Sequence, residues 1–445
     1  MSDKEKRSRY REMTMRYGDP WIWGIYLTLV VLSIVESYSA SSRDVALYGV
    51  YSPIIKQVIY LLIGAFFVIG LSRINYNNKI LLLVLIPLLW IFTMVALIYV
   101  LVAGEVVNGA QRAFTIPVIG LSVQPSELAK LSAVTALAYI MAKNQQDRDV
   151  SNKGIVISAA LVAFFGALMI NSGLTNTLLL MSISAAMFVV GGAKIKKLLV
   201  VLGIYIIVAG LFWVWKDFSD KREENMRKIT AIQNSQAVTV DKSKVVDRTG
   251  LRKDRIYNWL HRDELLHDSV NSENSQEMFS IMAQAHGGLW GVGIGNSREC
   301  SRLPLAFSDY IFSIIMEEIG LIGGIFVIIL YLWLLSRAAM IARRCHRVLP
   351  ALLIIGMAAM ITFQALFHMA INTGVFPVSG EPLPLISKGG TSILVTSVAI
   401  GVMLSVSRTI VNNANGKNKD DGNKLPSGLD ARNPSEIPVK NEWKQ

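Results

Sequence analysis

Charged residues are scarce in this sequence. Only 17% of its 445 residues are Asp, Glu, Lys or Arg, whereas 52% are hydrophobic, and the mean hydropathy is +0.44. Soluble proteins carry roughly 25% charged residues. The deficit excludes an ordinary soluble protein, because so few charges cannot keep a chain of this length in water.

Cysteine and histidine are also scarce. The chain has two cysteines, Cys300 and Cys345, which cannot build a disulfide framework and have no metal-ligand spacing. Three of the five histidines, His261, His267 and His286, lie in one polar segment and match no zinc-binding pattern. We interpret these histidines as solvated loop residues, and a zinc site is not expected.

Long apolar runs are abundant instead. A membrane-spanning helix needs roughly 20 predominantly apolar residues. Ten such runs occur, at about 21–40, 54–72, 80–101, 126–142, 154–170, 174–191, 196–215, 308–335, 349–371 and 389–407. The fourth, sixth and tenth contain several Ser, Thr or Asn, which predicts a face turned toward other helices or water. The pattern predicts an all-α membrane protein with about ten transmembrane helices.

Lys and Arg are concentrated in alternate loops. The basic segments are 1–20, 73–79, 143–153, 194–197 and 337–347, and the short loops between them hold few basic residues. The positive-inside rule places such loops in the cytoplasm, which predicts cytoplasmic N- and C-termini. The same rule accounts for the net charge of +12, so no nucleic-acid partner is expected.

Three segments lie outside the predicted ten-helix membrane domain of residues 21–411. Residues 1–20 form a basic cytoplasmic N-terminal segment, and residues 216–307 form one large extracytoplasmic loop between helices seven and eight. Residues 412–445 are rich in Asn, Lys, Asp, Gly and Pro, which predicts a disordered cytoplasmic tail. In the large loop, the Gly-rich residues 287–296 follow no strand, so they predict a tight turn near the membrane surface rather than a nucleotide-binding loop.

Polar residues near the external rim are the candidates for chemistry, because polar groups are costly at membrane depth. In QPSELAK, residues 124–130, Glu127 suits the positive N-terminal end of a helix. Lys130 lies three residues later, so the two side chains can pair on one face. Arg112, in the preceding NGAQR segment, has no obvious local partner and could bind a lipid phosphate bidentately.

Carboxylates mark the eighth apolar run. Asp309 opens this run and could either cap a helix or act in catalysis. Glu317 and Glu318 follow more than two turns later, inside the apolar run. Carboxylates at that depth need partners or protons, so we expect them to line a polar cavity or, more simply, to pair with Lys or Arg of another helix.

Residues 372–392 join the last two runs and contain two prolines and a Gly pair before the final run. This composition predicts a re-entrant loop. Lys388 in this loop could snorkel toward the rim or, beside the Gly pair, help bind an anion. Its neighbour Ser387 is a further candidate for substrate binding.

Four segments in this order resemble the SEDS family of peptidoglycan glycosyltransferases, typified by FtsW, RodA and SpoVE. They are NGAQR with QPSELAK, then GGLWGVGIGNS, LPLAFSDYIFSIIMEEIG and NTGVFPVSGEPLPLISKGGTS. The resemblance extends from the first run to about Arg408 and is closest to FtsW. It implies an enzyme of the bacterial cytoplasmic (inner) membrane that polymerises lipid II, the undecaprenyl-diphosphate-linked disaccharide pentapeptide, for cell division.

The chain departs from the family pattern at several positions. Asp309 matches the essential carboxylate of the family motif P-E-x-H-T-D-F, but Leu305 and Phe307 replace the motif's Glu and His. Lys388 stands where Tyr is usual in ISYGGS, and residues 171–175 lack the Asp of an acidic motif. These changes leave the central carboxylate and alter its surroundings.

The resemblance implies a mechanism in which Asp309 is the general base for the acceptor's 4-hydroxyl, with inversion at the donor's anomeric carbon. The leaving diphosphate needs positive charge. The candidate substrate-binding residues are Arg112, Lys388, Lys130, Glu127, Arg298 and Ser387, with Glu317 and Glu318 in support. No tightly bound cofactor is expected, although the substrate could carry Mg²⁺ or Mn²⁺.

Other functions stay open on the sequence alone. The carboxylates inside the eighth run, Glu317 and Glu318, would also suit a lipid II flippase. A RodA-type elongation polymerase and a scaffold that has lost catalysis are further alternatives. Asp309 at the external rim beside a long loop favours the enzyme. The expected partners are a class B penicillin-binding protein transpeptidase, divisome or elongasome proteins, and membrane lipid.

Overall fold

The computed structural model describes residues 3–40, 51–76, 78, 80–107, 110–116, 121–146, 149–170, 173–207, 210, 259–261, 274–303, 305–414, 429 and 431–433. Within these residues, seven helices are long and apolar enough to cross a membrane. They are α2 (Pro20–Ser39), α4 (Tyr51–Arg73), η1 with α5 (Leu81–Leu85 and Ile86–Ala103), α7 (Asn152–Met169), α13 (Ile311–Ala342), α14 (Val348–Asn372) and α15 (Gly390–Ala414). The chain is therefore a multi-pass membrane protein.

Three further apolar segments are helical without meeting that criterion. They are α6 (Pro125–Lys143), α8 (Leu174–Val190) and residues 195–207. The described part of each of the ten predicted runs is thus largely helical, and the count of ten spans stays a prediction. Most of the predicted loop 216–307, including His267, lies outside the described residues.

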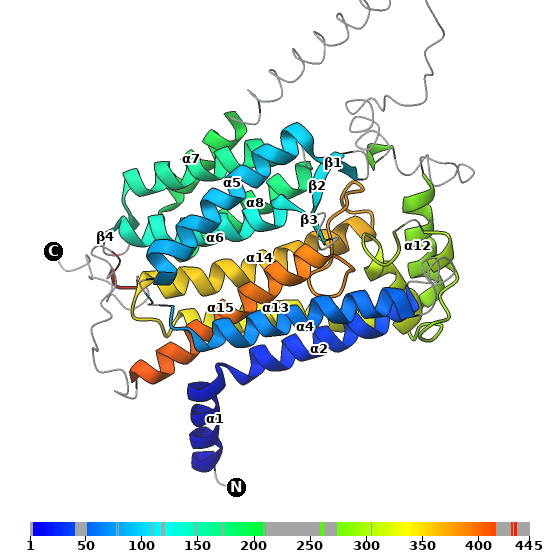
Figure 1. Cartoon of the computed structure of the whole chain (residues 1–445), viewed down its shortest axis with the longest axis horizontal. Helices are drawn as coiled ribbons and strands as arrows, with labels where there is room; N and C mark the ends of the chain where they lie inside the picture. Colours follow the sequence, from blue (N-terminus) through cyan, green and yellow to red (C-terminus); the bar gives the residue numbers. More distant parts are fainter. Residues whose placement is uncertain are drawn as a thin grey trace, which may run out of the picture.

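The helices form a bundle around α14 (Figure 1). α14 packs against α6, α8, α13 and α15, and 94% of its apolar window is buried inside the protein. Only 22% of the corresponding windows of α4 and α5 is buried. Large apolar side chains on those two helices, such as Phe66 and Val102, face outward, as expected for helices whose outer faces contact lipid.

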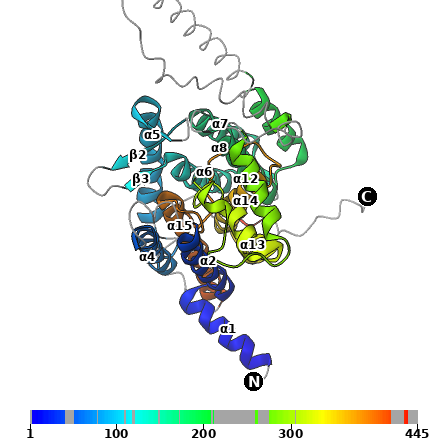
Figure 2. The ribbon, with the colours of Figure 1, turned by 90° about the vertical axis from the view of Figure 1, so that its right-hand side faces the viewer.

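Short strands interrupt the helical architecture at one end of the bundle. β1 (Glu105–Val107), β2 (Ala110–Ile116) and β3 (Leu121–Val123) form an antiparallel sheet in the order β1-β2-β3, which projects from the bundle in Figure 2. β4 (Gln145–Gln146) pairs with β5 (Asp149–Val150) at the other end. The all-α prediction is wrong in this detail, because Val, Thr, Phe and Ile between the helices favour extended pairing.

The helix α13 is broken at Gly320, whose φ of 81° and ψ of −175° are not helical. The Gly-rich segment that follows α12 (Ser275–Gly287) inserts at this break. Val292 N and Gly293 N donate to the carbonyl oxygens of Glu317 and Glu318, each at 2.9 Å. In return, Leu321 N donates to Gly288 O at 2.9 Å. The segment was predicted as a tight turn, and it also replaces the backbone hydrogen bonds that the break removes.

We expect Gly320→Ala to destabilise the protein. A side chain at this φ and ψ adds strain of about 1–3 kcal/mol, and its Cβ would collide with the backbone of Leu289 and Gly291. The measurement is the thermal melting of detergent-solubilised protein followed by size-exclusion chromatography. Gly24→Ala on α2 is the control, because no atom lies within 4 Å of a Cβ there. Equal melting of the two variants would contradict the assigned role of the break.

Part of the C-terminal region packs against the bundle. Leu429 is 1% exposed, and Asn433 Nδ2 donates to Ala342 O at 3.0 Å and to Cys345 O at 2.8 Å. Val348 N donates to Ala431 O at 3.0 Å. The prediction of a wholly disordered tail is wrong for these residues, because they satisfy carbonyl groups left open at the end of α13.

Candidate active site

Asp309 lies in a tight turn directly before α13. Its carboxylate Oδ1 accepts a hydrogen bond from Ser308 Oγ at 3.0 Å, and its backbone N–H donates to Leu305 O at 3.0 Å. Leu305 has a φ of 58°, a strained conformation for a non-glycine residue. Asp309 is 9% exposed. The turn thus holds a mostly buried carboxylate at the end of the bundle where β1–β3 and α12 lie (Figure 1).

Asn372, the last residue of α14, holds the Asp309 turn in place through hydrogen bonds of its side-chain amide. Its Nδ2 donates to Asp309 O at 3.0 Å and to His368 O at 2.9 Å. Its Oδ1 accepts from Ser313 N at 3.2 Å and from Ser313 Oγ at 3.0 Å. One amide therefore ties α14 to the start of α13. Asn372 stands within a recognised motif, but its spacing gave no reason to assign it this position.

The helix α12 reaches the same point. Ser280 Oγ donates to Asn372 O at 2.8 Å, and Gln284 Nε2 donates to the same oxygen at 2.6 Å. Ser280 and Ser313 hydroxyls lie 2.7 Å apart. The apolar spacing of α12 predicted a helix but assigned no role to Ser280 or Gln284. The helix α12 and the Asp309 turn thus form one hydrogen-bonded unit.

The loop between α14 and α15, predicted to be re-entrant, contacts the Asp309 turn. Ser387 Oγ donates to Ser308 O at 2.7 Å and accepts from Leu383 N at 2.7 Å. Lys388 N donates to Phe307 O at 3.0 Å. Ser387 is buried, so its hydroxyl holds the loop against the turn, and its proposed substrate contact stays a prediction.

Lys388 places a cation beside the turn. Its Nζ lies 4.5 Å from the centre of the Phe307 ring, within the range of a cation–π contact. Phe307 and Lys388 are two of the positions at which the sequence departs from the SEDS pattern. The structure brings these two departures into contact, so Lys388 lies against the residue that stands two positions before Asp309.

Glu127 and Lys130 form the ion pair that their spacing predicted. Lys130 Nζ lies 2.7 Å from Glu127 Oε1, 2.9 Å from Gln364 Oε1 and 3.5 Å from Glu381 Oε2. Lys130 is 0% exposed, and Gln364 Nε2 also donates to Pro382 O at 3.2 Å. This buried cluster contacts Glu381 and Pro382 in the loop between α14 and α15 and holds that part of the loop in place. Contact of Glu127 or Lys130 with substrate stays a prediction.

The expected pairing of Glu317 and Glu318 with Lys or Arg is not found among the described residues. Glu317 accepts from Ser297 Oγ at 2.5 Å and from Arg298 N at 3.0 Å, while Glu318 accepts from the Ser39 hydroxyl. The pairing prediction is wrong because the segment after the Gly-rich insertion brings backbone N–H groups to Glu317, and such groups hold anions well.

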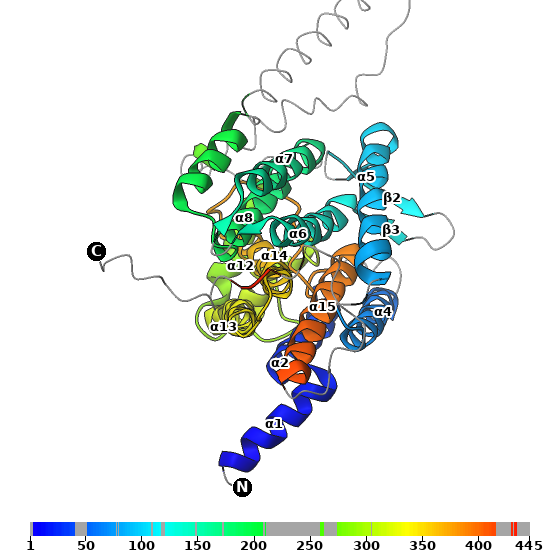
Figure 3. The ribbon, with the colours of Figure 1, turned by 90° about the vertical axis from the view of Figure 1, so that its left-hand side faces the viewer.

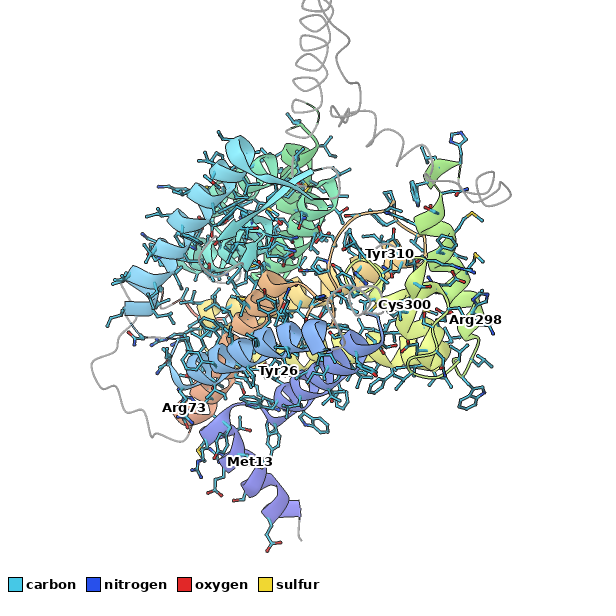
Figure 4. The ribbon with its side chains drawn as sticks, turned by 45° about the vertical axis from the view of Figure 1, so that its right-hand side comes forward. Met13, Tyr26, Arg73, Arg298, Cys300 and Tyr310 are labelled. Carbon is cyan, nitrogen blue, oxygen red and sulfur yellow. The ribbon has the colours of Figure 1, made fainter. Side chains whose placement is uncertain are left out.

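Two further predictions concern the same segment. His286, predicted to be solvated, lies 3.6 Å from Glu299 Oε1 and 3.7 Å from Glu317 Oε1. Glu299 begins the short helix η3 (Glu299–Ser301). Arg298 has an exposed side chain and lies at the outer edge, farther out than Tyr310 (Figure 4). Its proposed contact with substrate would therefore be at the rim.

The remaining candidates for charge stabilisation are Arg112 and a metal ion. Arg112 belongs to β2, but its side chain lies outside the described residues. In the described part of the chain, no group of three or more His, Cys, Asp or Glu side chains is placed to hold a metal ion. Cys300 and Cys345 are both buried.

Comparison with curated proteins gives full-length relatives. The chain is 27% identical over 399 residues to the probable peptidoglycan glycosyltransferase FtsW of Bacillus subtilis, covering 88% of each chain. It is 28% identical over 405 residues to stage V sporulation protein E of the same organism, covering 89% of this chain and 99% of the relative. These matches span nearly the whole membrane domain.

Solved structures share the fold. A chain of a peptidoglycan synthase complex aligns with a TM-score of 0.61 at 24% identity, covering 88% of this chain and 98% of that chain. The rod shape determining protein RodA of Thermus thermophilus aligns with a TM-score of 0.57 at 23% identity, covering 88% and 97%. The FtsW/RodA/SpoVE family model, described as cell cycle protein, matches residues 20–412. This chain therefore belongs to the FtsW/RodA/SpoVE family of cell cycle proteins.

Proposed function

We propose that this chain is a peptidoglycan glycosyltransferase that polymerises lipid II into glycan strands, with Asp309 as its catalytic base. The observation that carries the proposal is the Asp309 turn, which Asn372 holds from α14 and Ser387 holds from the re-entrant loop. A carboxylate fixed in this way, with a lysine nearby, suits proton abstraction next to a departing anion. The relatives named as probable peptidoglycan glycosyltransferases support the same substrate class.

In the proposed reaction, the acceptor's 4-hydroxyl gives its proton to the Asp309 carboxylate as its oxygen attacks the donor's anomeric carbon. The bond between that carbon and the diphosphate oxygen breaks, and undecaprenyl diphosphate leaves with the electron pair. A single displacement inverts the anomeric carbon. The hydrogen bond from Ser308 Oγ orients the carboxylate, which reduces the reorganisation needed at the moment of transfer.

Positive charge must meet the leaving diphosphate. Lys388 is the proposed near cation, and Arg112 and Arg298 would act from the rim. Lys130 and Glu127 are buried against the loop between α14 and α15. They would position Lys388 rather than touch the diphosphate. In this proposal a Mg²⁺ or Mn²⁺ ion would arrive on the substrate, and no step is assigned to a protein-bound metal.

The proposal includes a location and a partner. Ten spans, both termini in the cytoplasm and an external site in the bacterial cytoplasmic membrane agree with the basic loops. The structural similarity to a chain of a peptidoglycan synthase complex supports a class B penicillin-binding protein as partner. The FtsW-named relatives support a division role, and identifying the copurifying transpeptidase separates division from elongation.

Polymerisation of purified lipid II tests the proposed function. The chain, with its copurified partner in detergent, should convert lipid II into glycan strands that are visible on a gel. Parallel reactions with EDTA, and with added Mg²⁺ or Mn²⁺, test the substrate-borne ion. Translocation of lipid II across a vesicle membrane without any polymer would instead identify a flippase and overturn the enzymatic proposal.

We expect Lys388→Ala to lower polymerisation roughly 10–100-fold, mainly in kcat, because the diphosphate gains charge as the bond breaks. Lys388→Arg keeps the charge and should retain most of the activity. Phe307→Leu is the matched control for packing, because it removes the ring but preserves the backbone bond to Lys388. Equal losses for Phe307→Leu and Lys388→Ala would indicate that packing, rather than charge, matters here.

We expect Asn372→Ala to lower kcat roughly 10–100-fold with little change in KM, because a displaced base loses alignment with the hydroxyl. The variant removes the bond from Nδ2 to Asp309 O. Thr373→Val is the neighbouring control, because the Thr373 hydroxyl donates to Met369 O within α14. A parallel rise in KM, or an unchanged kcat, would argue against a positioning role for Asn372.

A further inference from the structure

The N-terminal helix α1 (Asp3–Tyr17) is fixed to the bundle rather than free. Asp19 caps α2 by accepting from Trp21 N at 2.9 Å, and it also accepts from Tyr10 OH at 2.7 Å and from Arg337 Nη2 at 2.7 Å. Burial, together with the hydrogen bond to Asp19, raises the pKa of Tyr10 to about 12, so its hydroxyl stays a donor. One carboxylate therefore joins α1, α2 and α13.

A close backbone contact secures the end of α1. Gly18, between α1 and α2, has a φ of 87°, and a Cβ there would lie 2.9 Å from Leu404 O of α15. Only glycine allows this approach and this conformation together. Thr14, one turn earlier, is buried. The direction of α1 is thus set by three helices of the bundle.

The helix α1 extends away from the spans rather than alongside them. In Figure 1 the spans lie lengthwise and α1 points away from them, and in Figure 3, where the bundle is seen end-on, α1 still extends outward. Trp21 and Trp333 stack nearby, with ring centres 4.9 Å apart. Tryptophan marks the membrane–water boundary, so α1 starts at the level of the lipid headgroups and follows the membrane surface.

The chemistry of α1 suits an anionic surface. Its 15 residues carry six Lys or Arg and three Asp or Glu, a net charge of +3. Arg11 and Arg16 are exposed, and Met13 and Tyr17 are the exposed large apolar side chains of this helix. With so little apolar surface, α1 cannot enter the acyl region, and its contribution must be electrostatic.

We propose that α1 is a rigid binding platform for anionic phospholipid headgroups of the leaflet at its end of the bundle. Its position at headgroup level and its positive charge favour this occupant over an acidic protein. Because the bundle fixes α1, Arg11 and Arg16 are arranged before lipid arrives, and binding requires no folding step. The proposal is independent of the activity assigned to Asp309.

The test places a fluorophore on α1. Ser8 is exposed, whereas Cys300 and Cys345 are buried, so Ser8→Cys takes an environment-sensitive dye selectively, with wild-type protein as the labelling blank. Detergent-solubilised protein is titrated with short-chain phosphatidylglycerol or phosphatidylcholine. We expect saturable binding of phosphatidylglycerol that weakens as salt is raised, and a much smaller response to phosphatidylcholine.

Charge variants make the result decisive. The double variant Arg11→Gln/Arg16→Gln should raise the Kd for phosphatidylglycerol about 30-fold, whereas Glu12→Gln, which removes a negative charge from the same helix, should lower it about fivefold. Met13→Ala should leave it unchanged. Equal responses to both lipids, no effect of the arginine changes, or tighter binding of a poly-glutamate peptide than of phosphatidylglycerol would overturn the proposal.

Discussion

Asp309→Asn is expected to lower lipid II polymerisation by about 10²–10⁴-fold, the usual contribution of a general base. Asparagine has almost the same shape and can still accept the hydrogen bond from Ser308 Oγ, but it cannot take the proton of the acceptor hydroxyl. The backbone bonds of the turn, to Leu305 and Asn372, do not depend on the side chain. The variant should therefore fold normally and bind lipid II with a similar KM.

The matched control for this experiment is Ser308→Ala. It removes the neighbour's hydrogen bond but leaves the carboxylate, so we expect a loss of less than about tenfold. Gel analysis of glycan products and chromatography of each purified variant separate activity from folding. Turnover by well-folded Asp309→Asn at a level close to that of the wild type would remove Asp309 from the mechanism.

Lys130→Met should be the most destabilising of the single substitutions considered. It removes the cation from a cluster in which Lys130 and Glu127 are 0% and 2% exposed. Removing one partner of a buried ion pair costs about 3–5 kcal/mol, since the remaining charge has lost its solvation and its partner. Here both Glu127 and Glu381 face the lost ammonium group. We expect a clearly lowered melting temperature and poor recovery from detergent.

Two comparisons identify the cause of this loss. Lys194→Met removes a lysine whose side chain is 76% exposed and lies 3.9 Å from Asp149, and an exposed pair of this kind contributes little. Adding Glu127→Gln to Lys130→Met should recover part of the stability, because one of the two unpaired carboxylates is then neutral. If Lys194→Met and Lys130→Met melted alike, the buried charge would not explain the effect.

Composition and periodicity predicted most of the framework. The described parts of the ten apolar runs are largely helical, since long hydrophobic runs leave few alternatives in a membrane. The spacing of Glu127 and Lys130 predicted their ion pair, because residues three apart share one face of a helix. The sheet β1–β3 was not predicted, since pairing of such short strands depends on the turns and on contacts with neighbouring segments.

The sequence predicted which residues belong to the site, but not how most of them are arranged. Asp309 and Lys388 were selected because charge near the rim is costly, but the contact between Lys388 and Phe307 joins residues far apart in the chain. The roles of Asn372 and Ser280 depend on where three helices meet. Glu317 was assigned the wrong kind of partner, since no local pattern reveals that the segment after the glycine-rich insertion supplies backbone N–H groups.

The interruption at Gly320 divides α13 into two mechanical units. The outer nine residues, 311–319, accept hydrogen bonds from residues 292 and 293, whereas the start of the inner portion donates to residues 288 and 289. The glycine-rich segment, which carries the exposed Trp290, therefore holds the two portions at a fixed angle. A force applied to this segment would change that angle and tilt the Asp309 turn, because the helix is not continuous at Gly320.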